Sequence, residues 1–244
     1  KALAKCPDLK IVEADFAAYK VYSASLMKLL KTYTSRVEQA SIDEAYIDIS
    51  GMEDTFVFEE EDDEFPINVA NSIRKEVRSR LGFTVNIGIS SNKLLAKMAS
   101  DFEKPDKVHT LFPEEIASKM WKLPINSLYG CGSSTALRLK GLGVRTIGDA
   151  AVMDEAVLRS HLGDKHGSYI YRSANGIDED EVKLKRDDAK GYSSETTLPH
   201  DINSSNYREE APSVLKYLSE NISRRLKKDD VYAGTISVQI KTDR

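Results

Sequence analysis

Apolar residues recur at helical spacing in two long stretches of the first half of the chain. The first stretch runs from Asp15 to about Thr34, and its broad apolar stripe comprises Phe16, Tyr19, Val21, Tyr22, Leu26, Leu29 and Leu30. The second stretch repeats the spacing at Ile67, Ala70, Ile73, Val77 and Leu81. Side chains three or four positions apart share one face of an α-helix, so both stretches predict amphipathic helices.

Runs rich in β-branched and apolar residues predict strands around these helices. Val37–Ser41 and Ala45–Ile49 flank a tight turn at residues 42–44, and residues 83–89 (FTVNIGI) form a third run. A further short apolar strand is expected at Leu9–Val12. These runs predict a hairpin followed, after the second helix, by another strand.

A strand-to-helix junction follows the third run. Ser90 or Ser91 is expected to cap a helix that runs to about Glu103, before Lys104–Asp106 breaks it. The predicted order is then strand, helix, hairpin, helix, strand, helix. This order indicates an α+β fold in which helices cover one face of a mixed, largely antiparallel sheet and leave the other face free.

The rest of the chain divides into three segments. Short helices are predicted from residue 113 to about residue 177, polar residues 178–190 indicate an exposed linker, and residues 192–244 read strand, helix, strand. The last segment is too short to bury a sheet face alone, which indicates half of a domain. We expect boundaries at 1–108, 109–178, 179–191 and 192–244, and both ends of the chain have the pattern of interrupted elements.

Composition and charge exclude several classes of protein. The 244 residues carry 35 Lys and Arg against 39 Asp and Glu, so the chain lacks the overall basicity typical of nucleic-acid binders. Residues 59–64 (EEEDDE) hold six of those acids and predict a solvated loop. Cys6 and Cys131 lie far apart and indicate neither a disulfide framework nor a zinc site, which favours a reducing compartment. No run of about 18 apolar residues predicts a membrane span.

The predicted hairpin turn carries two adjacent acids, Asp43 and Glu44. Within a strand they would point to opposite faces, whereas at a turn both can converge on one cation. Close carboxylates raise each other's pKa unless a cation holds both ionised, and Mg²⁺ favours such oxygen ligands together with substrate phosphates. Taken alone, the dipeptide is more typical of a solvated turn, but its flanking isoleucines place it within a sheet, where unpaired charge is costly.

Two lysines lie four residues apart on the capped helix. Lys93 and Lys97 therefore share one helix face, while Leu94, Leu95 and Met98 form an apolar face. A lysine pair beside a carboxylate-bound metal can bind triphosphate oxygens. The alternative is a solvated face of an amphipathic helix.

These two motifs together resemble a known family. Residues 41–50 (SIDEAYIDIS) followed by residues 88–107 (GISSNKLLAKMASDFEKPDK) resemble the palm of the Y family of translesion DNA polymerases, particularly its bacterial DNA polymerase IV branch. The resemblance extends over nearly the whole chain in the order palm, thumb, little finger. It implies that Asp43 and Glu44 are two of three catalytic, metal-binding carboxylates and that Lys97 contacts the phosphates of the incoming nucleotide. Asp48 lies in the same motif but is not expected to bind metal directly.

A glycine-rich turn opens another predicted helix. Gly130 and Gly132 precede Ser133 and Thr135, and such a turn exposes backbone N–H groups at a helix N-terminus where a phosphate can bind. A plain helical turn explains a lone G-x-G equally well. Residues 130–149 as a whole resemble the helix-hairpin-helix of the family's thumb, which implies contact with the DNA backbone. Lys140 is either a further phosphate contact or an ordinary surface lysine.

Residues 191–199 resemble the opening strand of the family's little finger. Ser193, Ser194 and Thr196 are therefore expected to contact DNA phosphates, although Ser and Thr alternation is also typical of any half-exposed strand. A basic helix end complements the helix dipole and is a weaker DNA-binding candidate, comprising Arg224, Arg225, Lys227 and Lys228.

The resemblance implies a DNA-directed DNA polymerase that acts in lesion bypass and DNA repair with two Mg²⁺ ions. Its expected partners are primer–template DNA, deoxynucleoside triphosphates and a sliding clamp bound through a C-terminal tail beyond this sequence. The expected compartment is the bacterial cytoplasm. The family's first carboxylate strand and its fingers precede the matched motifs, so the chain alone is expected to be an inactive fragment. Two alternatives are a palm-type nucleotidyl cyclase, which needs no duplex-binding glycines, and a non-catalytic DNA-binding module.

Overall fold

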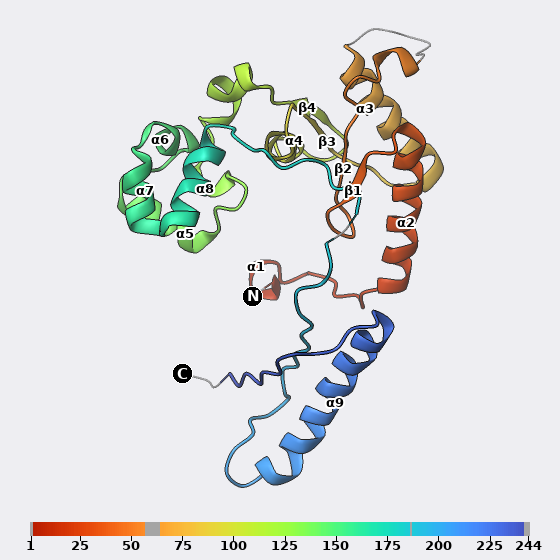
Figure 1. The fold of residues 1–244 in the computed structure, drawn as a ribbon, viewed down its shortest axis with the longest axis vertical. Helices are drawn as coiled ribbons and strands as arrows, with labels where there is room; N and C mark the ends of the chain where they lie inside the picture. Colours follow the sequence, from red (N-terminus) through yellow and green to blue (C-terminus); the bar gives the residue numbers. More distant parts are fainter. Residues whose placement is uncertain (1, 57–63, 186, 242–244) are drawn as a thin grey trace. The chain divides into compact units, whose positions relative to one another are not determined.

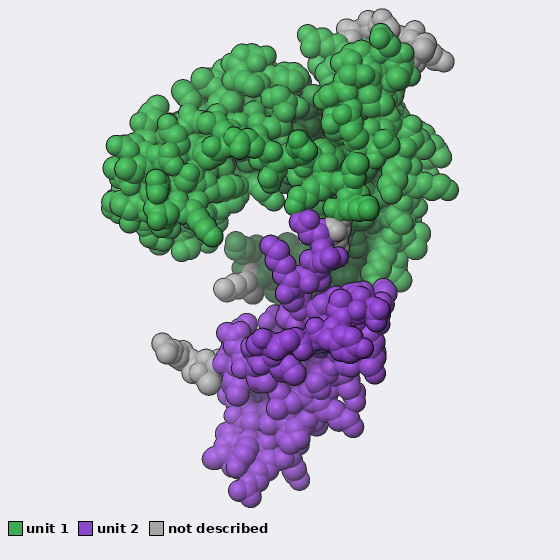
Figure 2. All heavy atoms as spheres, viewed as in Figure 1, with its two compact units in different colours: residues 1–186 green, residues 187–244 purple. Residues whose placement is uncertain are grey.

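The computed structural model describes residues 2–56, 64–185 and 187–241 of the chain. It divides into two compact units, residues 1–186 and residues 187–244, which Figure 2 distinguishes by colour. The predicted boundary near residue 108 does not separate compact units in this structure.

The first unit begins with two helices of different character. Helix α1 (Ala2–Lys5) is a short exposed turn, and α2 (Phe16–Tyr33) follows it in Figure 1. Asp15 caps α2 as predicted, because its carboxylate accepts a hydrogen bond of 2.9 Å from the backbone N–H of Ala18. The C-terminal half of α2 is buried, whereas the apolar side chains of its N-terminal half are mostly exposed.

Among the described residues, four short strands form two separate pairs. Strands β1 (Val37–Gln39) and β2 (Ala45–Ile47) are antiparallel and form the predicted hairpin. Strands β3 (Ile87–Ile89) and β4 (Val108–Thr110) are parallel. The sequence did not predict β4, and the expected largely antiparallel sheet is instead one antiparallel and one parallel pair.

Helix α3 (Phe65–Glu76) packs with α2 over both strand pairs. Its buried residues Val69 and Ile73 belong to one apolar cluster with Leu26 and Leu30 of α2, and Ile47 and Ile87 of the strands pack against that cluster. A π-helical turn, η2 (Val77–Leu81), continues α3 to the predicted end at Leu81. A short 3₁₀ turn, η1 (Glu53–Thr55), lies between the hairpin and α3.

Helix α4 (Lys93–Ser100) connects the strand-bearing region to the helical region that follows. Its backbone lies directly against β3, because a Cβ atom built on Gly88 would approach Ala96 O to 1.9 Å. Only glycine allows this approach. Leu95, Met98 and Ala99 on another face of α4 are buried in the core of the helical region, which explains why the two regions form one compact unit.

The helical region has a closed apolar core. It begins with three short turns, η3 (Pro113–Glu115), η4 (Ile116–Met120) and η5 (Ile125–Ser127). The helices that follow gather together in Figure 1 and are α5 (Ser133–Gly141), α6 (Ile147–Val152), α7 (Glu155–Leu162) and α8 (Asp164–Ala174). Their side chains Leu139, Ile147, Leu158 and Ile170 are fully buried. This all-helical region agrees with the sequence prediction.

The second unit contains one long helix, α9 (Tyr207–Lys228). The strands predicted on either side of it, at residues 191–199 and 231–241, form no ladder among the described residues. Tyr192 instead packs on the end of α9, where its hydroxyl donates to Asp229 (2.7 Å) and the Arg225 guanidinium lies 5.2 Å from its ring centroid. A strand requires a paired neighbour, and no described segment provides one.

Three further predictions need correction. Leu9–Val12 is not a strand; Ile11 and Val12 are exposed, and no described strand lies beside them. Asn92, not a serine, caps α4 by accepting from the Leu95 N–H (2.9 Å), because Ser90 instead donates to Leu111 O. The helix ends at Ser100 and not near Glu103.

The acidic block falls mostly outside the described residues. Of residues 59–64, Glu64 alone is described, and it precedes the first turn of α3. Within the described ranges, no helix has both the length and the apolar character needed to cross a membrane.

Candidate active site

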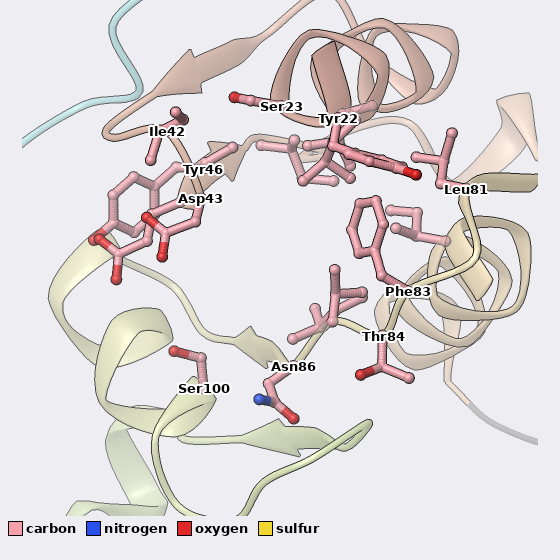
Figure 3. Close-up of a pocket in the computed structure, with 18 of the residues that line it drawn as sticks. Tyr22, Ser23, Ile42, Asp43, Tyr46, Leu81, Phe83, Thr84, Asn86 and Ser100 are labelled. Carbon is pink, nitrogen blue, oxygen red and sulfur yellow. The ribbon is translucent and has the colours of Figure 1, made fainter. Parts of the chain in front are cut away.

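A cavity of about 830 Å³ lies between the two strand pairs of the first unit. Its walls come from α2, the β1–β2 hairpin, residues 81–88 and the C-terminal part of α4. Figure 3 shows Asp43 and Tyr46 on one side of this space and Tyr22 and Phe83 on the other. The cavity therefore has aromatic rings on both sides and the Asp43 carboxylate on one of them.

Asp43 and Glu44 occupy the hairpin turn, as the sequence predicts. The backbone N–H groups of Ala40 and Ser41 both donate to Glu44 O, at 3.0 and 3.1 Å, and so close the turn. The Ser41 hydroxyl donates to Asp43 Oδ1 (2.6 Å) and orients that carboxylate. Both acids are exposed and line the cavity, so their oxygens remain accessible to a cation.

Lys97 lies beside Glu44 at the same wall. Its Nζ is 3.0 Å from Glu44 Oε1 and 2.9 Å from Asp101 Oδ2, and its side chain is 16% exposed. Burial alone would lower the pKa of Lys97, but hydrogen bonds to Asp101 and Glu44 outweigh burial and raise that pKa above its ordinary value. The ammonium group is thus held in its charged form at the cavity.

The described residues contain no group of three or more His, Cys, Asp or Glu side chains arranged to hold a metal ion. Asp43 and Glu44 nevertheless suit a hard divalent cation, which favours carboxylate oxygens and is commonly held by one or two of them with substrate phosphates. The donor chemistry of the turn therefore fits magnesium, with the remaining ligands supplied from elsewhere.

Asp48 does not line this cavity and is held by partners of its own. Arg36 Nη1 lies 2.9 Å from Asp48 Oδ2, and the Ser50 N–H donates to Asp48 Oδ1 (2.8 Å). Burial would raise the pKa of Asp48, but the Ser50 hydrogen bonds and the Arg36 charge lower it. Asp48 thus has a structural role at the end of the hairpin.

Gly130 and Gly132 precede α5 but differ in their surroundings. Gly130 has φ +80°, and a Cβ there would lie 2.5 Å from the Tyr169 ring, whose hydroxyl donates to Tyr129 O (3.0 Å). Gly132 is the N-cap of α5 with φ −68°, and a Cβ there meets nothing within 4 Å. Gly130 is needed for the fold of the turn, whereas Gly132 leaves open space at the helix N-terminus.

The other predicted DNA-binding residues of the helical region are not all at this N-terminus. Ser133 is exposed in the first turn of α5, and Thr135 Oγ1 lies 3.1 Å from His166 Nε2. Lys140 is exposed in the last turn of α5, at the other end of a nine-residue helix. Ser133 and Gly132 therefore form the N-terminal surface, and Lys140 does not.

Ser193, Ser194 and Thr196 lie in the second unit without regular secondary structure. Arg225 Nη1 donates to Ser193 O (2.8 Å), so at least one arginine of the basic helix end packs within the unit. Sequence reasoning also missed two partners at the candidate site, Asp101 and Glu38. The spacing of Asp101 four residues after Lys97 was a detectable signal, but the Glu38–Lys93 contact joins residues 55 positions apart and had none.

Three segments of the chain match known protein families. Residues 1–101 match the impB/mucB/samB family, residues 126–178 match the thumb domain of DNA polymerase iota, and residues 189–244 match the C-terminal domain of the impB/mucB/samB family. The candidate site at Asp43, Glu44 and Lys97 lies within the first match.

Curated relatives match along nearly the whole chain. DNA polymerase IV of Clostridium acetobutylicum is 38% identical over 242 residues, which are 98% of this chain and 57% of the relative. DNA polymerase IV 1 of Bacillus subtilis is 35% identical over 237 residues, which are 97% of this chain and 54% of the relative. The chain thus spans about half the length of the curated relatives it matches.

Solved structures show the same fold. A DinB family error-prone DNA polymerase from Sulfolobus solfataricus superimposes with a TM-score of 0.66 at 28% identity, over 75% of this chain and 53% of that one. An insertion ternary complex of Dbh DNA polymerase gives a TM-score of 0.65 at 28% identity, over 75% of this chain and 51% of that one.

Proposed function

The chain belongs to the Y family of DNA polymerases, and from that premise we propose that its activity is template-directed nucleotidyl transfer in lesion bypass. The observation that carries the proposal is the placement of Asp43, Glu44 and Lys97 on one wall of the 830 Å³ cavity. The proposed substrates are primer–template DNA and deoxynucleoside triphosphates.

Each residue of that wall has a proposed role in the reaction. Asp43 and Glu44 would hold two Mg²⁺ ions together with a third carboxylate from the family's first strand. Bound Mg²⁺ supplies the charge that lowers the pKa of the primer 3′-hydroxyl and neutralises the triphosphate. Lys97 would bind phosphate oxygens as a point charge.

The Glu44–Lys97 ion pair links the proposed role of Glu44 to that of Lys97. In this structure the two charges neutralise each other at 3.0 Å. If Glu44 held a metal ion, Lys97 would lose one of its two carboxylate partners and retain Asp101. Its ammonium would then be available for the triphosphate at the cavity wall.

The thumb would contribute positioning contacts with the DNA backbone. The exposed N-terminus of α5 at Gly132 and Ser133 presents backbone N–H groups and a positive dipole end to a phosphate. Contacts by Thr135, Lys140, Ser193, Ser194 and Thr196 remain predictions. A sliding clamp as partner and the bacterial cytoplasm as compartment are likewise proposals, which rest on the family resemblance.

Primer extension tests the proposed reaction. The chain is assayed alone and joined to the flanking segments of the Clostridium acetobutylicum relative, each with and without Glu44→Gln. We expect extension by the joined protein and a loss of about 10²-fold or more in the variant, because a metal ligand and the partner of Lys97 are both removed. Asp54→Asn, an exposed acid in η1, is the matched control and should leave the rate unchanged.

The alternatives give different products in the same assay. A nucleotidyl cyclase converts a nucleoside triphosphate to a cyclic product without a primer, and a binding module extends nothing. Extension that is unaffected by Glu44→Gln would contradict the assigned role of the hairpin turn.

A further inference from the structure

The segment that follows α8 is mostly exposed, as its polar sequence predicts, but it also makes specific contacts with the strand-bearing region. In Figure 1 this segment runs past α4 towards β1. Asn92 Nδ2 donates to Gly176 O (2.9 Å), and the Leu94 N–H donates to Asp178 Oδ2 (2.9 Å). Residues 178–183, named here the strap, therefore begin at the N-terminus of α4.

A half-buried ion pair holds the other end of the strap. Lys93 Nζ lies 3.0 and 2.8 Å from the two carboxylate oxygens of Glu38, and the two side chains are 14% and 17% exposed. The Lys183 N–H donates to Glu38 Oε2 (2.7 Å), and Lys93 Nζ also donates to Glu181 O (3.2 Å). The Tyr46 ring lies 5.2 Å from the same ammonium. One ion pair thus joins β1, β2, α4 and the strap.

Two lysines of α4 connect this helix to the same hairpin. Lys93 contacts Glu38 on β1, and Lys97, one turn later, contacts Glu44 in the turn. The Lys97 contact is the more open one, since Glu44 is 45% exposed, and the proposed reaction breaks it. Neither Lys93 nor Glu38 lines the cavity, so we expect a nucleotide bound there to leave the Lys93 contact in place.

We propose that Glu38 and Lys93 are positioning residues, a clamp that fixes α4 to the hairpin, keeps Lys97 at Glu44 and fastens the strap across both. The role of Lys97 towards phosphate rests on the proposed function, whereas the clamp itself does not. When Lys97 exchanges Glu44 for a nucleotide, the clamp keeps the helix in register with the hairpin.

Hydrogen exchange on the 244-residue chain tests the strap. In Glu38→Gln the Lys183 N–H keeps only a weaker, uncharged acceptor, and Lys93 loses its charge partner. We therefore expect the Lys183 amide to exchange about tenfold faster, which corresponds to a loss of about 1.4 kcal/mol in the free energy of local opening. Glu179→Gln is the matched control, because Glu179 lies in the strap but pairs with Arg172 at 84% exposure of its own side chain. Equal protection of Lys183 in all three proteins would overturn the proposal.

Lysine reactivity tests the effect on Lys97, which an anchor for the strap alone would not change. In competitive acetylation read by mass spectrometry, Lys97 should react slowly in the unaltered chain and several-fold faster in Glu38→Gln and Lys93→Met. Lys93→Arg can still pair with Glu38 and should restore slow reaction. Unchanged Lys97 reactivity in Lys93→Met would show that the pair does not position Lys97.

The pH dependence of the unaltered chain provides a test that needs no folded variant. Lys93 on α4, Lys183 on the strap and Tyr46 on β2 face Glu38. Burial would raise the pKa of Glu38, but hydrogen bonds from the Lys183 N–H and Lys93 lower it. Protection of the Lys183 amide should therefore persist above the ordinary glutamate pKa and disappear as pH falls through the lowered one.

Protection that does not change over that pH range would count against the clamp. None of these measurements uses DNA or nucleotide. If the joined protein fails primer extension but the 244-residue chain shows the expected exchange and reactivity, the proposed function is lost and the clamp is kept.

Discussion

The helical region and the strand-bearing region of the first unit meet at α4 but are closed to different degrees. In the helical region Leu139, Ile147, Leu158 and Ile170 are fully buried in one continuous core. The described part of the strand-bearing region has three-residue strands in two separate pairs and an 830 Å³ cavity between them. Short consecutive helices bury one another through local contacts, whereas strands require partners from distant parts of the chain.

This difference relates to function. In the proposed function the closed region presents a helix N-terminus to a DNA backbone, and the open region admits a nucleotide beside Asp43 and Lys97. Helix α4 connects the two regions, because its apolar face is buried in the helical core and its lysines contact the hairpin.

The largest expected effect on stability comes from a substitution in the closed core. Leu139→Ala removes a fully buried side chain of α5 and should lower the free energy of unfolding by about 3 kcal/mol, through lost burial and the cavity left behind. Leu137→Ala on the same helix, where Leu137 is exposed, is the control and should change it by less than about 0.5 kcal/mol. Urea denaturation measures both, and equal effects would show that the core is not closed as described.

A smaller effect separates the two glycines of the turn before α5. Gly130→Ala should destabilise the chain by about 2 kcal/mol, because the residue has positive φ and its Cβ would meet the hydrogen-bonded Tyr169 ring. Gly132→Leu should leave stability nearly unchanged, since its Cβ direction is open.

A measurement of duplex DNA binding then tests whether Gly132 differs from Gly130 in function as well as in stability. Binding of the unaltered chain at low salt should weaken steeply as salt rises, because phosphate contacts release counterions. Gly132→Leu should weaken that binding several-fold without unfolding the chain. If Gly132→Leu binds DNA as tightly as the unaltered chain, the N-terminus of α5 is not a phosphate contact.

The smallest expected effect is a pH dependence in the strand-bearing region. The Tyr33 hydroxyl and then Arg80 donate hydrogen bonds to Glu76 and lower the pKa of that carboxyl. Its stabilising contribution is therefore present above the ordinary glutamate pKa and is lost as pH falls through the lowered value. Glu76→Gln should make the acid side of the stability curve shallower by less than about 1 kcal/mol. An identical curve in the variant would exclude a contribution from Glu76.

The sequence by itself determined the elements whose signals are local. Asp15 capping α2, the hairpin around Asp43 and Glu44, the helix ending at Leu81 and the helical region after residue 113 all follow from spacing and capping within a few residues. The resemblance that led to the family rests on the same contiguous motifs, at residues 41–50 and 88–107.

Tertiary structure alone decided the features that depend on distant partners. Residues 9–12 and 231–241 pair with no described strand, whereas β3 pairs with β4 and the strap is hydrogen-bonded to Glu38. Each of these outcomes depends on segments far apart in sequence. A strand pattern indicates only that a segment can pair with another strand. A charged sequence indicates only that the segment can be exposed to solvent. Packing decides whether a partner lies at hydrogen-bonding distance. Lys93 and Glu38 are 55 positions apart and meet because α4 packs beside the hairpin, which neither local sequence predicts.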